Sequence, residues 1–205
     1  MASRISDALQ LDGKFASVPS DAFNDMLVAE NERLTLELNR LRLELLDLEH
    51  KADTDPLVSV YNRRAFMREV GRAKSVESRY GILSCVIFFD LNNFKTVNDR
   101  FGHAIGDELL RKVGTVLTQG VRSCDLVARL GGDEFGVLLF KTTIEEAKAK
   151  ASALACRISE QVVEMPTGTI EVNAAWGVAP CEAGDSAEQI LARADRNMYI
   201  KKQNL

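Results

Sequence analysis

The chain has 205 residues, of which 46% are hydrophobic and 27% charged, and its formal net charge is −4. These values are typical of a globular protein with one core domain plus an appendage. The negative charge excludes a broad nucleic-acid-binding surface, although one nucleotide needs only a local cluster of positive charge. The four cysteines form no CxxC pair, and His103 is the only histidine near them, so we expect reduced core thiols rather than zinc or redox chemistry.

The sequence has no membrane signal. The longest apolar run near its middle, residues 85–89, is too short to span a bilayer. The N-terminus lacks the pattern of a signal peptide. We therefore expect a cytoplasmic protein whose chain has neither a membrane nor a nucleic acid as a partner.

The N-terminal part contains a heptad pattern. Residues 1–24 are polar and remain an uncertain segment. A spacing of alternating four and three residues then joins Leu27, Asn31, Leu34, Leu38, Leu41, Leu45, Leu48 and Ala52. Leucine fills every d position, and a single Asn at a favours a parallel two-stranded coil. The pattern predicts a coiled-coil dimerisation helix over 25–52; the alternative is an amphipathic helix packed on its own domain.

The remaining residues, 53–205, alternate between helical and extended patterns. Pro56 ends the preceding helix. We expect helices at 62–76, 107–119, 143–163 and 187–202, strands at 82–89, 125–130, 135–140 and 170–179, and a loop from residue 90 through 95. The helix at 143 has Thr142 or Thr143 as its N-cap, and Ser186 caps the last helix. The order of elements predicts an α+β fold with a mainly antiparallel sheet flanked by helices.

The segment Gly131-Gly132-Asp133-Glu134-Phe135 lies between two apolar runs and predicts a hairpin. Paired glycines let the backbone adopt positive φ and let a ligand approach closely. Adjacent carboxylates at a turn repel each other unless a cation lies between them. The hairpin therefore predicts a nucleotide–Mg²⁺ site, and the alternative is a tight structural turn without a ligand.

A second acidic position follows the strand at 82–89. Asp90 ends that strand, where metal ligands are common, and the next loop offers backbone N–H groups and Lys95 to phosphates. If this strand lies beside the hairpin, three carboxylates converge: Asp90, Asp133 and Glu134. The alternative for Asp90 is a helix or turn cap.

Taken together, these motifs resemble the GGDEF family of diguanylate cyclases. The resemblance covers about residues 53–202 and rests on Asp55-Pro56-Leu57 with Asn62-Arg63-Arg64, the segment from Asp90 to Asp107, Arg129 to Phe135, Trp176-Gly177-Val178, and Ala194-Asp195 with Tyr199 and Lys202. It implies a palm-like fold akin to nucleotidyl cyclases, preceded here by the coiled-coil helix. It also implies an enzyme that joins two GTP into cyclic di-GMP across a homodimer and releases two pyrophosphates.

The resemblance assigns roles at the carboxylate cluster. Asp90, the carbonyl of Leu91, Asp133 and Glu134 would bind two Mg²⁺ ions per site, with Mn²⁺ as an alternative. Asp133 would also help to deprotonate the attacking 3′-hydroxyl, Glu134 would complete the metal shell, and Lys95 would stabilise phosphate charge. These three are the implied catalytic residues, and the arrangement fits two-metal chemistry.

The resemblance also assigns a substrate pocket to Phe94, Asn98, His103, Asp107 and Lys202. Asn98 and Asp107 would read the guanine edge, since a carboxylate accepts from N1–H and the exocyclic amine; this favours GTP over ATP. Lys202 would reach the terminal phosphates. The alternatives are loop and N-cap duty for Asn98 and Asp107, and an indirect, orienting role for His103.

A regulatory motif matches as well. Arg122 and Asp125 form an RxxD pattern that ends five residues before Gly131. The resemblance implies an inhibitory site there for the product cyclic di-GMP, with Arg157 as a secondary arginine. The alternative is a local surface ion pair.

The chain departs from the family pattern in three places. Asn92 replaces a second Asp, Val-Ser-Val at 58–60 replaces Thr-Gly-Leu, and the sequence stops at Leu205, before a phosphate-binding arginine that the family pattern leads us to expect. Two other functions stay open: a catalytically silent cyclic di-GMP receptor, and a cyclase of another dinucleotide. Trp176 is interpreted as a core residue without a chemical role.

Overall fold

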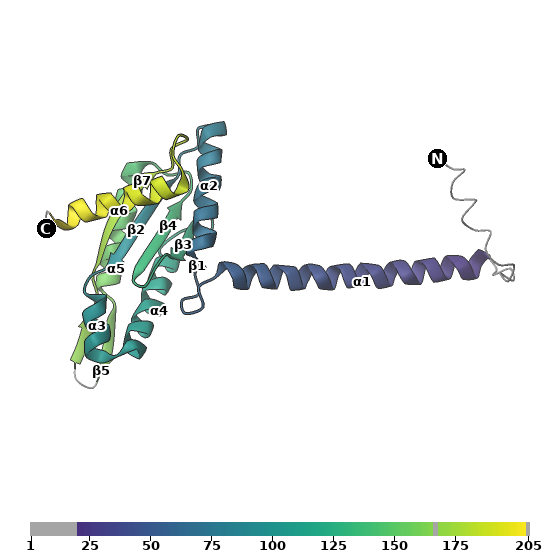
Figure 1. The fold of residues 1–205 in the computed structure, drawn as a ribbon, viewed down its shortest axis with the longest axis horizontal. Helices are drawn as coiled ribbons and strands as arrows, with labels where there is room; N and C mark the ends of the chain where they lie inside the picture. The colour runs from purple at the N-terminus through teal and green to yellow at the C-terminus, as the bar shows by residue number, and fades with distance from the viewer. Residues whose placement is uncertain (1–19, 166–167, 204–205) are drawn as a thin grey trace. The chain divides into compact units, whose positions relative to one another are not determined.

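The computed structural model describes residues 20–165 and 168–203, and Figure 1 shows their elements as a ribbon. By its contacts the chain divides into two units, Met1–Glu49 and His50–Leu205. Most of the uncertain segment 1–24 lies outside the described residues. Among the helices described, none combines the length and the apolar character that crossing a bilayer requires.

Helix α1, Ser20–Asp53, contains the heptad pattern, so the predicted helix is confirmed. Its intrahelical ion pairs are exposed, such as Arg40–Glu44 at 2.9 Å, and each stabilises the helix by only about 0.3–0.5 kcal/mol. Four seam leucines are 44–58% exposed: Leu27, Leu34, Leu38 and Leu41. The helix therefore presents an apolar stripe that nothing in its own unit covers among the described residues.

The second unit is built on a five-stranded sheet with the order β1-β3-β4-β2-β7. Its strands are β1 (Tyr61–Asn62), β2 (Cys85–Leu91), β3 (Leu126–Arg129), β4 (Glu134–Leu139) and β7 (Ala174–Pro180). β1 runs parallel to β3, and all other neighbours in this sheet are antiparallel. A separate antiparallel pair joins β5 (Val162–Met165) to β6 (Gly168–Glu171). The predicted mainly antiparallel sheet is confirmed.

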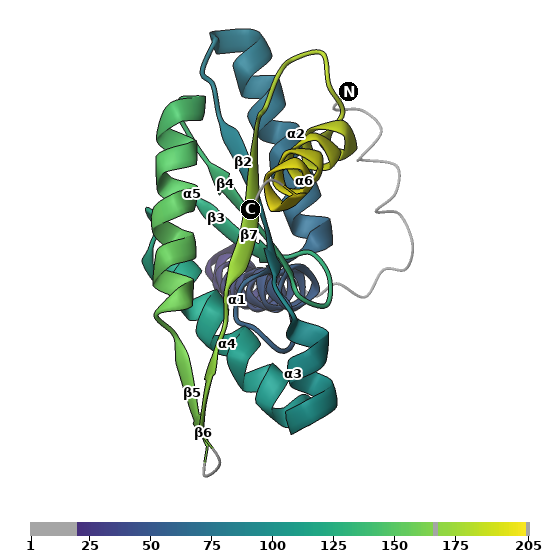
Figure 2. The ribbon, with the colours of Figure 1, turned by 90° about the vertical axis from the view of Figure 1, so that its left-hand side faces the viewer.

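Helices cover both faces of this sheet, as Figure 2 shows. The helices are α2 (Arg63–Tyr80) and α6 (Ala187–Gln203) on one face, and α3 (Phe94–Phe101), α4 (His103–Gln119) and α5 (Ile144–Ser159) on the other. Side chains of β2 alternate between the two cores: Val86 and Phe88 pack toward α2 and α6, and Ile87 and Phe89 toward α4 and α5. Because both faces are covered, β2 is apolar from Cys85 to Phe89.

The predicted helix caps are present. Thr143 begins α5 with a capping box, in which its hydroxyl accepts from the N–H of Glu146 and the Glu146 carboxylate accepts from the N–H of Thr143 at 2.8 Å. Ser186 and Gln189 make the same reciprocal pair before α6. These local signals fix where both helices begin.

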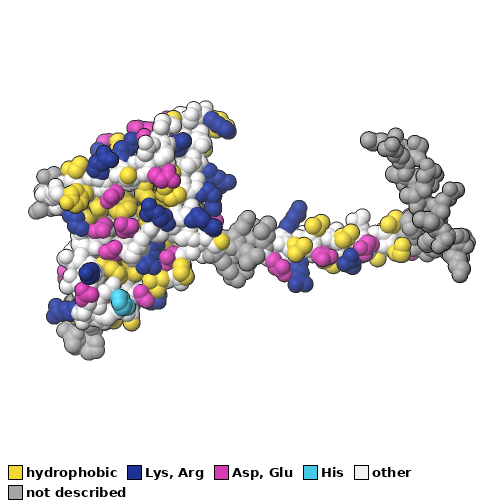
Figure 3. Space-filling model, in the orientation of Figure 1, with side chains coloured by type: hydrophobic (Ala, Val, Ile, Leu, Met, Phe, Trp, Pro, Cys, Tyr) yellow, Lys and Arg dark blue, Asp and Glu magenta, His cyan; other side chains and the backbone are white. Residues whose placement is uncertain are grey.

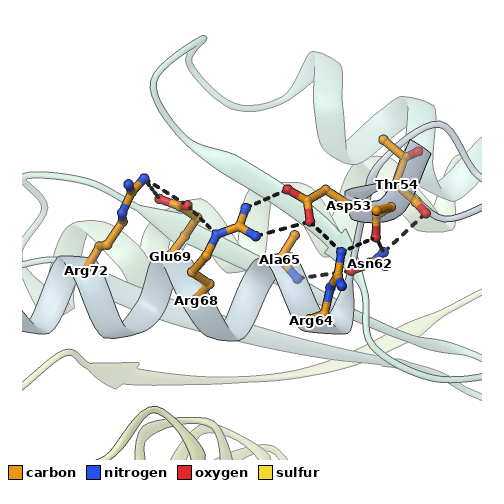
Figure 4. Close-up of polar contacts among 9 residues, drawn as sticks. Asp53, Thr54, Asn62, Arg64, Ala65, Arg68, Glu69 and Arg72 are labelled. Carbon is orange, nitrogen blue, oxygen red and sulfur yellow. Dashed lines mark hydrogen bonds and ion pairs between the residues drawn. The ribbon is translucent and has the colours of Figure 1, made fainter. Parts of the chain in front are cut away.

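The end of α1 and the start of α2 share one asparagine (Figure 4). The Asn62 amide donates to the carbonyl of Ala52 at 2.7 Å, and its oxygen accepts from the N–H of Ala65 at 3.0 Å, which caps α2. Beside it, Arg68 and Arg64 both contact Asp53, at 2.7 and 3.1 Å. The pKa of Asp53 is lowered, mainly by its hydrogen bond with Arg68.

Several boundaries differ from the sequence prediction: α2 extends to Tyr80, β2 covers Cys85–Leu91, and α4 begins at His103. Three further differences change the elements themselves. The expected loop through residue 95 becomes helix α3, which has only eight residues and an N-cap, Asn93, that makes no side-chain cap bond. The helix predicted to run to 163 ends at Ser159, and β5 follows. The strand predicted at 170–179 is split, because β6 pairs with β5 whereas β7 pairs with β2.

The cysteines differ in their surroundings. All four are free; Cys85 and Cys181 are buried, whereas Cys124 and Cys156 are exposed. Burial raises the pKa of Cys85 to about 11 and that of Cys181 to about 12. The expectation of core thiols is therefore wrong for Cys124 and Cys156.

Candidate active site

Three acidic residues from two motifs lie at one end of β2 and β4. Asp90 and Glu134 are cross-strand partners in the antiparallel ladder, and Asp133 directly precedes Glu134. The N–H of Leu91 donates to the carbonyl of Asp133 at 3.2 Å, which ties the turn to the end of β2. The register of the sheet thus brings together carboxylates that are more than 40 residues apart in the sequence.

The cluster carries negative charge that the protein compensates only in part. Burial raises the pKa of Asp133, and the neighbouring Asp90 adds to the rise. Burial also raises the pKa of Glu134, followed by repulsion from Asp133. An ammonium from α6 reaches the cluster, where Lys202 Nζ donates to Asp90 Oδ1 at 2.8 Å. Lys95 is exposed in the first turn of α3.

The donor set fits a hard divalent cation. Carboxylate oxygens are the ligands that Mg²⁺ prefers, and such an ion would relieve the repulsion that raises the two pKa values. Within the described ranges, no three His, Cys, Asp or Glu side chains are already gathered as a ligand set. Asp90 forms an ion pair with Lys202 at 2.8 Å. Leu91, whose carbonyl is an expected ligand, is the last residue of β2.

The two glycines of the hairpin act differently from the sequence prediction. Neither has a positive φ. Among the described glycines, only Gly81 and Gly102 do. A Cβ on Gly131 would lie 2.5 Å from the Glu134 carboxylate, so glycine makes room for that side chain, whereas a Cβ on Gly132 would meet nothing.

Arg129, two residues before Gly131, fixes this turn, a role that its motif did not indicate. Arg129 donates to the carbonyl of Gly132 at 2.8 Å and pairs with Asp55 at 3.4 Å. Asp55 in turn accepts from the N–H groups of Leu57 and Val58. Arg129 therefore links the hairpin turn to Asp55, which lies in the segment after α1.

Helices α3 and α4 carry the expected substrate residues. Asn98 is half-buried, and its Oδ1 is a buried atom without a hydrogen-bond partner. A Cβ on Gly106 would lie 2.0 Å from that oxygen, so glycine permits the close packing. Asp107 lies inside α4, which begins at His103, so it does not act as the N-cap. His103 is exposed, whereas Phe94 is buried in the core.

The RxxD motif forms a compact turn before β3. The Asp125 carboxylate accepts from the N–H groups of Arg122 and Phe140, at 3.0 and 3.1 Å. Arg122 is exposed beside a hollow of about 430 Å³. Arg157 of α5 lies close to this turn, since its Nη1 would be 3.0 Å from a Cβ placed on Gly120. The structure therefore places Arg122 and Asp125 in one turn, in which Asp125 also accepts from backbone N–H groups, and places Arg157 beside Gly120, two residues before that turn.

Charged side chains alternate on the face of the molecule that Figure 3 shows. Lys and Arg (dark blue) are interleaved there with Asp and Glu (magenta), and the exposed histidine (cyan) lies among them. On this face, the basic side chains are separated by acidic ones and do not form one continuous basic surface.

Comparisons with known proteins agree with this geometry. The sequence model of the family described as "Diguanylate cyclase, GGDEF domain" matches residues 52–205. The diguanylate cyclase TpbB of Pseudomonas aeruginosa strain UCBPP-PA14 is 36% identical over 173 residues, which cover 80% of this chain and 38% of TpbB. The diguanylate cyclase DosC of Escherichia coli K12 is 33% identical over 159 residues, covering 75% and 34%.

A solved structure extends the likeness to the N-terminal helix. The coiled coil and GGDEF domain of DgcB from Caulobacter crescentus, solved in complex with c-di-GMP, superimposes with a TM-score of 0.78 at 26% identity, covering 87% of this chain and 95% of that one. The chain spans just over a third of the length of TpbB and DosC. It belongs to the GGDEF family of diguanylate cyclase domains, a family of enzymes with the palm fold of nucleotidyl cyclases.

Proposed function

We propose that this protein condenses two GTP molecules into cyclic di-GMP and releases two pyrophosphates. The convergence of Asp90, Asp133 and Glu134 at the end of β2, where the chain continues into α3, carries the proposal. The reaction needs a base for the 3′-hydroxyl, positive charge at the α-phosphate, and a pocket that recognises guanine. The family membership supports the same reaction. With GTP as its substrate, the enzyme would work in the cytoplasm.

Asp133 takes the proton from the attacking 3′-hydroxyl in this mechanism. When bound by Asp90, Asp133, Glu134 and the carbonyl of Leu91, two Mg²⁺ or Mn²⁺ ions supply Lewis-acid stabilisation of the attacking and leaving oxygens. Lys95, at the start of α3, stabilises charge on the phosphates.

The selectivity for guanine comes from α3 and α4. Asp107 accepts from N1–H and the exocyclic amine, and Asn98 contributes an amide whose oxygen has no partner in the protein. A buried acceptor without a donor costs about 1–3 kcal/mol, and a donor on the base would satisfy it. His103 lines the pocket, and Phe94 contributes its backbone, while Lys202 binds terminal phosphates.

The reaction requires two copies of the chain. One site holds one GTP, so the attacking hydroxyl comes from a second site that faces it. We assign residues 25–52 to a dimerisation helix and 53–205 to the cyclase domain, with residues 1–24 as a separate N-terminal segment. The exposed leucine seam of α1 supports this assignment, because a parallel partner helix would bury it.

The product would inhibit the enzyme at Arg122, Asp125 and Arg157. Arginine binds phosphate and the guanine edge through two parallel hydrogen bonds, and the Asp125 carboxylate accepts guanine donors. The backbone hydrogen bonds to Asp125 support this role, since they hold the turn in one conformation.

The decisive experiment incubates the dimeric protein with GTP and Mg²⁺ and identifies the products by mass spectrometry. We expect cyclic di-GMP and pyrophosphate in a 1:2 ratio. The Asp133→Asn variant should fold with an unchanged circular dichroism spectrum and lose turnover by at least about 10³-fold. A protein that binds cyclic di-GMP but forms no product is a receptor, and one that incorporates ATP is a different cyclase; either result refutes the proposal.

A further inference from the structure

A groove runs along α4 beside the segment that joins α1 to β1 (Figure 1). Its volume is about 420 Å³, and its walls come from residues 57–60 and from the second half of α4, beginning at Arg111. A Cβ on Gly114 would lie 2.2 Å from Val58 Cγ1, so glycine lets the segment pack directly on the helix. Among the described residues that line the groove, none is acidic.

The groove continues into the hollow beside Arg122. Four residues line both spaces: Ser59, Val60, Thr118 and Gln119. Together the two spaces form one depression, which reaches from Arg111 at one end to the Arg122–Asp125 turn at the other. An arginine therefore lies at each end of the depression, and the apolar side chains of the 57–60 segment lie between them.

The guanidinium of Arg111 has no protein partner among the described residues. The side chain is exposed, and the structure gives its guanidinium neither a hydrogen bond nor an ion pair there. Glu108, one helical turn before Arg111, pairs with Lys112 at 3.5 Å. All five N–H donors of Arg111 are therefore available to a ligand, and a guanidinium binds phosphate through two parallel hydrogen bonds.

Two threonines follow Arg111 on the same side of α4 and supply hydrogen-bond acceptors. Thr115 Oγ1 donates to the carbonyl of Arg111 at 2.9 Å, and Thr118 Oγ1 donates to the carbonyl of Gly114 at 2.8 Å. Because each hydroxyl gives its one proton to the helix, its oxygen can only accept from a ligand. Guanine offers N1–H and an exocyclic amine as donors. The groove thus suits a guanine with a phosphate.

We propose that this groove binds the second half of cyclic di-GMP, whose first half is held by the Arg122–Asp125 turn. The inference rests on the proposed function, which places the inhibitory product at that turn. Cyclic di-GMP consists of two identical guanosine monophosphate units joined in a ring, so a site for one unit leaves a second phosphate and a second guanine beside it. Arg111 binds that phosphate, and Thr115 and Thr118 accept from that guanine.

This placement also connects the bound product to the catalytic hairpin. Leu57 and Val58, which line the groove, donate their N–H groups to Asp55 at 3.0 and 2.8 Å. Asp55 pairs with Arg129 at 3.4 Å, and Arg129 donates to the carbonyl of Gly132 at 2.8 Å. A ligand held between this segment and α4 therefore acts on residues that are linked to the turn of the hairpin.

Cyclic di-GMP is the probe, measured by isothermal titration calorimetry and as an inhibitor of GTP turnover. Arg111→Gln should raise its dissociation constant and its inhibition constant by about 10-fold or more, because a paired charge-assisted hydrogen bond is lost. The initial rate without added product and the thermal midpoint should stay unchanged, since the side chain is exposed. Arg79→Gln removes the same charge from α2, on the opposite face of the sheet, and should change neither constant.

A second variant tests the groove while keeping the arginine. Thr115→Glu places a carboxylate one helical turn from Arg111, where it pairs with the guanidinium and repels a phosphate. It should weaken cyclic di-GMP binding about as much as Arg111→Gln does. Arg111→Lys keeps the charge but loses the paired donors, so its affinity should fall by only about 3-fold.

The outcomes separate the groove from the proposed function. If Arg122→Ala weakens cyclic di-GMP binding while Arg111→Gln and Thr115→Glu do not, the product site stands and the groove inference is wrong. An equal loss of affinity in Arg79→Gln would show a general effect of charge and would also overturn the inference, as would an unmutated protein that does not bind cyclic di-GMP. If the protein forms no cyclic di-GMP from GTP, the cyclase proposal fails, and the titration still decides whether Arg111 contacts the dinucleotide.

Discussion

Replacing Gly177 with alanine should lower both stability and turnover, although Gly177 is not one of the proposed catalytic or substrate-binding residues. Gly177 lies in β7 where α6 crosses, and an added Cβ would lie 2.1 Å from the carbonyl oxygen of Ala194 and 2.3 Å from the nitrogen of Met198. Both are backbone atoms, so no side chain can move aside. An ordinary contact begins at 3.4 Å, which requires α6 to withdraw by roughly 1.3 Å.

The cost follows from that displacement. Overpacking lowers the free energy of unfolding by about 1–3 kcal/mol. Alanine in place of a strand glycine raises it by about 0.5–1 kcal/mol, because alanine loses less conformational entropy on folding. The net loss of up to about 2.5 kcal/mol lowers the thermal midpoint of a chain this size by up to about 10 °C. Lys202 follows Met198 by one helical turn, and a displacement near 1 Å at a reacting centre can lower kcat by about 10²-fold.

Thermal unfolding by circular dichroism and GTP turnover would be measured on the same samples. Gly184→Ala is the matched control, because its Cβ would meet no atom within 4 Å and its φ is not positive. We expect the control to behave as the unmutated chain. A Gly177→Ala protein with the unmutated midpoint and turnover would show that α6 is not held against β7 as described.

Two further predictions concern the charged sites. Asp133 and Glu134 have folded-state pKa values above their usual ones, so the stability they contribute is lost as pH rises through those values; Mg²⁺ should therefore raise the thermal midpoint more at neutral pH than near pH ~4. An increase that is equal at both pH values would contradict this. Arg122→Ala should weaken product inhibition by about 10–100-fold, through loss of a paired charge-assisted contact. Inhibition curves for cyclic di-GMP that do not shift would remove Arg122 from that site.

The elements with strong local signals were predictable from the sequence. The heptad of α1, the capping residue Thr143 and the apolar run of β2 each specify structure within a short window. Helix α3 was not predictable in the same way. It has two turns, no side-chain cap, and a short apolar face whose burial depends on α4. The break between β6 and β7 was missed because the two strands differ in their partners rather than in their residues.

In the candidate site, too, some features could be predicted from the sequence and others could not. The order of motifs was enough to suggest that Asp90 and Asp133 meet, because each ends or precedes a strand. The positive φ predicted for Gly131 was wrong, and contact with Glu134 requires glycine there. The predicted close approach of a ligand stays a prediction. The placement of Lys201 over Trp176 joins two elements through side chains alone, and no pattern in either segment indicates it.

The contrast between the thiols has a practical consequence. Cys85 and Cys181 stay protonated and buried at mildly alkaline pH, so alkylating reagents that need an accessible thiolate do not react with them. Cys124 and Cys156 remain open to reaction. Cys124 lies within the Arg122–Asp125 turn, so a fluorophore can be attached there without introducing a new cysteine. The fluorescence of that label would report binding of a nucleotide at the proposed product site.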